Sequence, residues 1–298
     1  MWRSRFVCAL LVLVALPTLA GCGTAGSSAS RGLQVIAGEN FWGSLAAQLG
    51  GQHVSVTSIV SNPSADPHEY ESSTADARAF AEADYVIVNG AGYDDWASKL
   101  LRANPNPSRK VLVVADLLHK RTGDNAHFWY DPDAVRAVVD RISADYSSMD
   151  RPDASSYESL HESVAEALSP YYALIESIHN QFAGAPVAAT ESIFAYMAAA
   201  LGLNLVSPPQ FMQAISEGND PPASSVATFQ QQLDRGQVRL LVYNRQTVTA
   251  VTTNMSAIAR QRGVPLVGIS ETVEPANLTF QQWQIKQLQA IQKALEAR

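Results

Sequence analysis

Short apolar runs alternate with amphipathic stretches in two parts of the chain, and each part predicts four strands separated by helices. In the first part the predicted strands are Leu33–Ile36, Val54–Val60, Tyr85–Val88 and Lys110–Ala115. In the second part they are Pro186–Ala189, Leu203–Val206, Val238–Val242 and Leu266–Ile269. Strands separated by helices pair in parallel through right-handed crossovers. The pattern therefore predicts an α/β protein with two lobes, each a four-stranded, mostly parallel sheet with flanking helices.

Helical periodicity fills the intervals between these strands. The predicted helices are Phe41–Leu49, Thr74–Ala83, Tyr93–Ala103, Pro132–Tyr146, Ile193–Ala200, Ser224–Gly236, Ala250–Arg262 and Phe280–Ala297. Thr74 is the expected N-cap of the second of them. The segment from Ser207 to Ser224 contains two Pro-Pro pairs, and we expect an irregular, mobile loop there.

A long helical segment joins the two predicted lobes. Ala154–Ala183 carries helical periodicity without any strand, and a helix of thirty residues would be about 45 Å long. Pro170 lies inside it and predicts a kink or a split into two helices. We expect the N-terminal lobe at residues 33–150, the linking helical segment at 151–184 and the C-terminal lobe at 185–298.

The first residues have the pattern of a secretory signal. Two arginines precede the apolar run Phe6–Leu19, which is shorter than the roughly twenty residues that a membrane-spanning helix needs. The sequence Leu19-Ala20-Gly21-Cys22 resembles a bacterial lipobox, in which the cysteine is acylated and becomes the mature N-terminus. We therefore expect a signal peptide at residues 1–21, lipidation at Cys22 and a Gly/Ser/Ala-rich flexible tether at residues 22–32. This places the protein outside the cytoplasm, lipid-anchored to the outer face of the cytoplasmic membrane.

Composition narrows the chemistry of the mature protein. The sequence has two cysteines, Cys8 and Cys22, so removal of the signal and lipidation leave none for a disulfide, a thiolate metal site or a nucleophile. The formal net charge is −7, and no cluster of Lys and Arg occurs. An acidic surface of this kind argues against nucleic acid as a partner and is compatible with a cationic ligand.

Four side chains able to bind a metal ion follow predicted strands. His68 comes after the second strand and His127 after the fourth, while Glu191 and Glu271 follow the first and last strands of the second lobe. The carboxyl ends of parallel strands are where ligands bind in such sheets. Imidazole nitrogens and carboxylate oxygens suit divalent first-row metals, and two carboxylates bring a charge of about −2. His53, His119, His161 and His179 lack this context, and we expect them in turns or on the surface.

The sequences around these residues resemble a known family. Asp66-Pro67-His68-Glu69-Tyr70-Glu71 is similar to the first histidine motif of the solute-binding lipoproteins of zinc and manganese ABC importers. Asn89–Trp96, His127–Pro132 and Ala189–Tyr196 resemble further segments of the same family. The resemblance implies two lobes, a rigid linking helix, a metal ion buried in the cleft between the lobes and an ABC permease as partner. Glu69 and Glu71 are either groups that orient His68 or polar loop residues.

Two departures from the family pattern bear on the metal. Many zinc members have histidine at the third ligand position, where this chain has Glu191, as manganese and iron members do. The fourth ligand is usually aspartate, and Glu271 is the nearest match, with Glu274 as the alternative. Two carboxylates favour Mn²⁺ or Fe²⁺ more than a three-histidine set does, although Zn²⁺ binds more tightly to most such sites. The sequence therefore favours manganese without excluding zinc. We expect one divalent ion, Mn or Zn with Fe also compatible, bound by a monomer.

Two other classes of function remain open at this point. A metal-dependent hydrolase also uses histidines and carboxylates, but no Gly-x-Ser-x-Gly or His-Glu-x-x-His motif occurs in the chain. An adhesin or scaffold lipoprotein would need no ligand-capable residues at matched strand ends. We expect metal capture and delivery to a permease, with no catalytic residues.

Overall fold

The computed structural model describes residue 2, residues 32–64 and residues 67–297. The predicted signal peptide, the lipidation site at Cys22 and the tether lie outside these residues, apart from residue 2 and Gly32. In the described part of the chain, no helix is long and apolar enough to cross a bilayer.

The N-terminal sheet has four strands in the order β2-β1-β3-β4. They are β1 (Leu33–Glu39), β2 (Val54–Val60), β3 (Tyr85–Val88) and β4 (Lys110–Val113). All neighbours pair in parallel, with Leu33 opposite Val54 at the start of the β1–β2 ladder. Because β1 and β3 lie side by side at the centre, the direction of winding reverses there, and their carboxyl ends form the rim where a ligand can be held.

The C-terminal sheet repeats this topology in the order β6-β5-β7-β8. Its strands are β5 (Pro186–Ala189), β6 (Asn204–Leu205), β7 (Leu240–Asn244) and β8 (Leu266–Ile269), again all parallel. The predicted fold of two lobes with four-stranded parallel sheets is confirmed. Strand β7 runs two residues further than the sequence pattern predicts, to Asn244.

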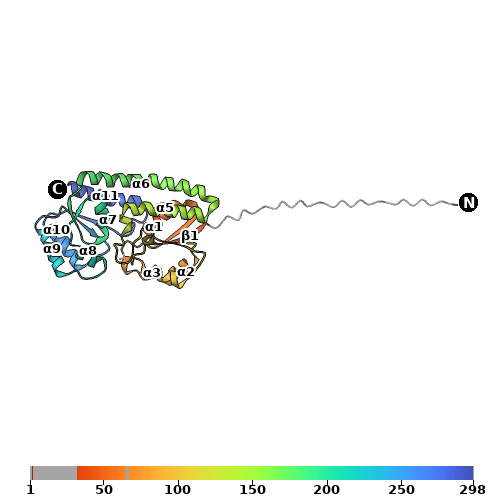
Figure 1. Cartoon of the computed structure of the whole chain (residues 1–298), viewed down its shortest axis with the longest axis horizontal. Helices are drawn as coiled ribbons and strands as arrows, with labels where there is room; N and C mark the ends of the chain where they lie inside the picture. The colour runs from red at the N-terminus through yellow and green to blue at the C-terminus, as the bar shows by residue number, and fades with distance from the viewer. Residues whose placement is uncertain (1, 3–31, 65–66, 298) are drawn as a thin grey trace. The chain divides into compact units, whose positions relative to one another are not determined.

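Helices cover the faces of both sheets (Figure 1). In the first half they are α1 (Asn40–Gly50), α2 (Thr74–Glu82), α3 (Asp95–Ala103), α4 (Val114–Leu117) and α5 (Pro132–Met149). In the second half they are α7 (Ala195–Ala200), α8 (Pro209–Ser216), α9 (Ala223–Asp234), α10 (Ala250–Gln261) and α11 (Phe280–Glu296). Short 3-10 turns include η1 (Gly51–His53), η2 (Pro67–Glu69), η3 (Phe128–Tyr130), η4 (Arg151–Asp153) and η5 (Ser192–Phe194).

The linking helix α6 (Ala154–Phe182) is continuous over 29 residues. It runs along one side of the protein beside α5 and α11 (Figure 1) and also contacts α1. The predicted split at Pro170 is wrong. Pro170 is exposed, so the carbonyl that loses its hydrogen bond to the proline can be solvated, while Leu168 and Tyr171 stay packed in the core on the other face.

One hydrophobic core extends through both halves. Val35, Tyr85 and Trp129 of the N-terminal lobe belong to the same cluster as Val187 and Ile269 of the C-terminal lobe. Two smaller clusters fill the opposite faces of the sheets, one behind each sheet. The lobes are therefore packed against each other rather than joined by the linking helix alone.

Local predictions also differ from the structure at the start of α2 and between the two Pro-Pro pairs. The N-cap of α2 is Ser73, whose side chain accepts from the backbone N–H of Asp76 in a capping box, so Thr74 is already the first helical residue. The segment predicted to be an irregular loop contains α8, with Phe211 and Ile215 buried. Pro209 occupies the first turn of that helix, where the missing N–H of proline costs no hydrogen bond.

Candidate metal centre

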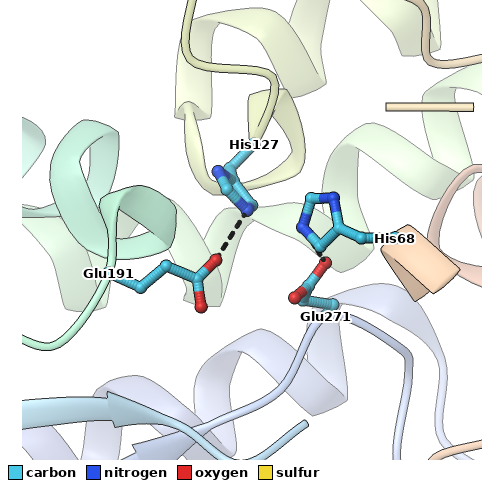
Figure 2. Close-up of side chains that lie close together, drawn as sticks. All are labelled: His68, His127, Glu191 and Glu271. Carbon is cyan, nitrogen blue, oxygen red and sulfur yellow. Dashed lines mark ion pairs between the residues drawn. The ribbon is translucent and has the colours of Figure 1, made fainter. Parts of the chain in front are cut away.

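The structure brings His68, His127, Glu191 and Glu271 together (Figure 2). His68 lies in η2 after β2, and His127 directly precedes η3 after β4 and α4. Glu191 and Glu271 follow β5 and β8. One ligand-capable atom from each residue lies within 4.8 Å of the others. Two of the four side chains come from each half of the chain.

Three of these four residues are buried, and His68 is exposed. The exposed fraction is 0% for Glu191 and Glu271 and 2% for His127, while the His68 side chain retains 25%. His127 Nε2 lies 3.3 Å from Glu191 Oε1, and His68 Nε2 lies 3.4 Å from Glu271 Oε2. Each histidine therefore presents its Nε2 atom to a carboxylate oxygen of the other lobe.

Asn125 fixes the orientation of the His127 ring. The side-chain oxygen of Asn125 is 2.6 Å from His127 Nδ1 and accepts from the His127 backbone N–H at 3.2 Å. Its side-chain nitrogen donates to the carbonyl of Ser192 at 2.8 Å, which establishes which end of the amide is the oxygen. Nδ1 of His127 is therefore the protonated nitrogen, and Nε2 is the atom available to a proton or a metal ion beside Glu191.

Asn244 and Tyr93 hold the two carboxylates. The side-chain nitrogen of Asn244 donates to Glu191 Oε2 at 2.7 Å and to Glu271 Oε1 at 2.6 Å. The Tyr93 hydroxyl donates to Glu271 Oε2 at 2.6 Å from the opposite lobe. Both carboxylates thus have their positions set by buried hydrogen bonds.

Burial makes the site unfavourable for negative charge when no cation is present. Burial raises the pKa of Glu271. The charge of the nearby Glu191 raises this pKa further, whereas the charge of His68 lowers it. Burial, together with the negative charges of Asp94 and Glu271, holds the pKa of Glu39 well above its ordinary range. Burial raises the pKa of Asp94 to about 6 against the lowering effect of backbone N–H groups. A cation bound among these groups would relieve this repulsion.

The other candidate residues lie elsewhere. Glu274 forms an ion pair with Arg245 at 3.1 Å and is not in the group of four. Glu69 and Glu71 are exposed. His161 pairs with Asp140 on the surface. His53 lies in the turn η1, and its ring is partly buried 2.9 Å from Asp153.

Sequence patterns alone do not reveal Asn244, Tyr93 and Asn125 as part of this site. Amide and hydroxyl groups are rarely metal ligands in such clusters, and Asn244 lies beyond the predicted end of its strand. The usable signal is position: Asn244 ends β7 and Tyr93 follows β3, so each lies at a strand's carboxyl end, as the four candidates do.

Residues 35–294 match the ZnuA family, described as zinc-uptake complex component A, periplasmic. The chain belongs to this family. The four candidate residues and their hydrogen-bonding partners all lie within the matched range. ZnuA is a family of metal-binding transport proteins rather than of enzymes.

Two manganese-binding lipoproteins named MntA are similar in sequence to this ZnuA family member. The protein of Halalkalibacterium halodurans is 27% identical over 275 residues, covering 88% of this chain and 86% of the relative. The protein of Bacillus subtilis is 32% identical over 146 residues, covering 46% of this chain and 47% of the relative.

Solved structures show the same fold. FpvC from Pseudomonas aeruginosa, in complex with Mn²⁺, superposes with a TM-score of 0.74 at 19% identity, covering 90% of this chain and 99% of that one. TroA, a periplasmic zinc-binding protein from Treponema pallidum, has a TM-score of 0.76 at 14% identity, with 89% and 99% covered. At sequence identities of 19% and 14%, this structural similarity establishes the fold of this ZnuA family member.

Proposed function

We propose that this protein captures one divalent transition-metal ion in a cleft between its lobes and delivers it to an ABC permease. His68, His127, Glu191 and Glu271 are the proposed ligands, with Nε2 of each histidine and one oxygen of each carboxylate facing the ion. The metal is the cargo of the protein, bound and released without chemical change.

The observation that carries the proposal is the pairing of two buried carboxylates with two imidazole Nε2 atoms. The distances of 3.3 and 3.4 Å across the two pairs are those of ligand atoms that share a small cation. Two carboxylates in a dry interior are costly unless a positive charge lies beside them. Fixing Nδ1 of His127 as the protonated atom leaves Nε2 for the ion.

The known relatives support a transition metal as cargo. Relatives and solved structures of this fold include proteins that bind manganese, zinc, nickel or cadmium. The donor set of two nitrogens and two oxygens is compatible with Zn²⁺, Mn²⁺ and Fe²⁺, of which Zn²⁺ binds such sites more tightly than Mn²⁺ or Fe²⁺.

We also propose roles for the N-terminal residues and boundaries for the two lobes. Residues 1–21 serve as a signal peptide, Cys22 carries the lipid, and residues 22–32 form the tether to the membrane. The N-terminal lobe, the linking segment and the C-terminal lobe comprise residues 33–150, 151–184 and 185–298. An extracytoplasmic place agrees with the periplasmic family and with the lipoprotein relatives. The protein works as a monomer and binds no nucleic acid.

Alanine substitution of a single carboxylate tests the assignment of ligands. Replacing Glu271 with alanine should weaken Zn²⁺ binding at least a hundredfold, about 2.8 kcal/mol, because one donor and one compensating charge are lost. Glu274→Ala is the matched control, since that glutamate lies three residues away and pairs with Arg245. Equal affinities for the two variants in a chelator-competition titration would refute Glu271 as a ligand.

A further inference from the structure

We propose that Asn244 restricts Glu191 and Glu271 to one metal-binding oxygen each, and thereby makes the site selective for a four-coordinate ion of the zinc class. This inference rests on the proposed function. It assigns a specificity-determining role to a residue that is not itself a ligand.

The orientation of the Asn244 amide is established by its surroundings. Its side-chain oxygen accepts from the backbone N–H of Gln246 at 2.9 Å, so the nitrogen is the end that faces the carboxylates. The residue is 2% exposed and ends β7, in the middle of the C-terminal sheet. The amide is therefore held rigidly by its own strand and turn.

The two hydrogens of this amide are directed to two different carboxylates. Its nitrogen lies 2.7 Å from Glu191 Oε2 and 2.6 Å from Glu271 Oε1, both shorter than its 3.1 Å contact with Thr247. Hydrogen bonds to charged acceptors are the shorter and stronger kind. The amide thus donates one hydrogen bond to each carboxylate, and each bond reaches a single oxygen.

The opposite oxygen of each carboxylate is the one that faces a histidine. Glu191 Oε1 lies 3.3 Å from His127 Nε2, and Glu271 Oε2 lies 3.4 Å from His68 Nε2. One oxygen of each glutamate thus accepts from the Asn244 amide and the other lies toward the metal position, where Glu271 Oε2 also accepts from the Tyr93 hydroxyl at 2.6 Å. Rotation of either carboxylate to offer both oxygens would break its bond to Asn244.

This division decides the number of donors that the ion meets. Two imidazoles and two one-oxygen carboxylates give four donors, the number typical of Zn²⁺. Two imidazoles and two bidentate carboxylates would give six donors, four of them oxygen, the kind of environment that Mn²⁺ prefers. Asn244 therefore favours Zn²⁺ over Mn²⁺, although two glutamates by themselves favour manganese more than a three-histidine set would.

The visible spectrum of the Co²⁺-loaded protein tests the proposal, because tetrahedral Co²⁺ absorbs far more strongly than six-coordinate Co²⁺. We expect strong bands for the wild-type protein. Asn244→Leu keeps a similar shape without a donor and should reduce the absorption several-fold while lowering the Zn²⁺/Mn²⁺ affinity ratio at least tenfold. Asn244→Ala, which leaves room for water, serves if the leucine variant does not fold. Thr247→Val is the control, since it removes the longer contact of the amide and leaves both hydrogen bonds to the carboxylates in place.

The outcomes separate this inference from the function on which it rests. If the wild-type protein binds no ion with one-to-one stoichiometry, the proposed function itself fails. If it binds Co²⁺ with weak, six-coordinate absorption, or if the Asn244 variants keep both the spectrum and the affinity ratio, metal capture stands and the role of Asn244 is refuted. An equal change in the Thr247→Val protein would also overturn it.

Discussion

The Glu191 side chain accepts a hydrogen bond from Asn244 and faces His127 across the lobes. It makes no hydrogen bond that caps the 3-10 turn beginning at Ser192, although it occupies the N-cap position. A capping hydrogen bond therefore does not explain the position of this side chain. Glu191 is 0% exposed, and the proposed cation between it and His127 would compensate for the burial of its charge.

Replacing Glu191 with histidine should move metal preference toward zinc. The variant would offer three imidazoles and one carboxylate, and exchange of a hard oxygen donor for nitrogen disfavours Mn²⁺. We expect the Zn²⁺/Mn²⁺ affinity ratio to rise at least tenfold, about 1.4 kcal/mol, in competition titrations. A ratio that stays constant while thermal stability changes would show that Glu191 is not a ligand.

The carboxyl group of Glu271 should destabilise the metal-free protein as pH rises. Burial raises its pKa above the ordinary value of 4.5, so the folded state holds the proton more tightly than the unfolded state. The free energy of unfolding therefore falls as pH increases from about 4.5 through the raised pKa. Glutamine at this position removes the ionisation, and the metal-free variant should melt about 2 °C or more above wild type at mildly alkaline pH.

The pH dependence of this difference identifies its cause. The gap in melting temperature between Glu271→Gln and wild type should narrow toward pH 4.5, where the wild-type carboxyl is protonated in both states. Glu274→Gln, at the ion pair with Arg245, is the control. A gap that is independent of pH, or a less stable Glu271→Gln protein, would mean that packing rather than ionisation decides the effect.

At the residue scale, the sequence identifies the four residues that the structure brings together, but not the residues that form hydrogen bonds with them. His68, His127, Glu191 and Glu271 carry lone pairs that metals use, and each follows a predicted strand. Asn244 belongs to a residue type that rarely binds such metals, and the direction of its amide is established by the backbone N–H of Gln246, which a sequence pattern does not reveal.

At the scale of elements, α6 shows how tertiary packing overrides a local signal. Pro170 predicts a break, yet the helix continues because its buried stripe packs on α1, α5 and α11 along its length. The same limit applies to α8, where prolines predict a loop but Pro209 lies in the first helical turn, where proline is tolerated. Strands β2, β3, β5 and β8 match their predicted bounds because their apolar runs are short and sharply ended.

Replacing Pro170 with alanine should stabilise the protein without changing metal affinity. Proline in a helix interior removes one hydrogen bond and costs about 3 kcal/mol relative to alanine in isolated helices, and an exposed site leaves no packing reason for it. We expect a gain of about 1–3 kcal/mol in denaturant unfolding. Ser169→Ala, the exposed neighbour, is the control and should gain less than about 1 kcal/mol. Loss of stability in the Pro170→Ala protein would contradict this account of α6.

At the scale of the whole molecule, the lobes share one core and several buried hydrogen bonds. The Tyr93 hydroxyl reaches Glu271, and the Tyr130 hydroxyl donates to the carbonyl of Ser270 and to Gln287. Asn40 bonds in both directions with the backbone of Val273. The two halves of the proposed site are therefore held close together by packing before any ion binds, which lowers the entropic cost of metal capture.

Metal affinity should fall as the solution becomes acidic. Protons compete with the ion for imidazole nitrogen, whose ordinary pKa is about 6.5, and for the carboxylates. Between about pH 7.5 and pH 5.5 we expect the Zn²⁺ affinity to fall at least tenfold in isothermal titration. The same affinity at both values would rule out imidazole ligation by His68 and His127.

The central claim, that ligands from both lobes enclose one ion, is tested most directly by calorimetric titration of the metal-free protein with Zn²⁺ and with Mn²⁺. We expect saturable binding of one ion per chain for each metal, with Zn²⁺ tighter, and an affinity at least about a hundredfold lower when either His127 or Glu271 is replaced with alanine. Removal of one ligand from each lobe must have this effect if both lobes complete the site. Titrations that show no saturable one-to-one binding, or an affinity that neither substitution lowers, would contradict this claim.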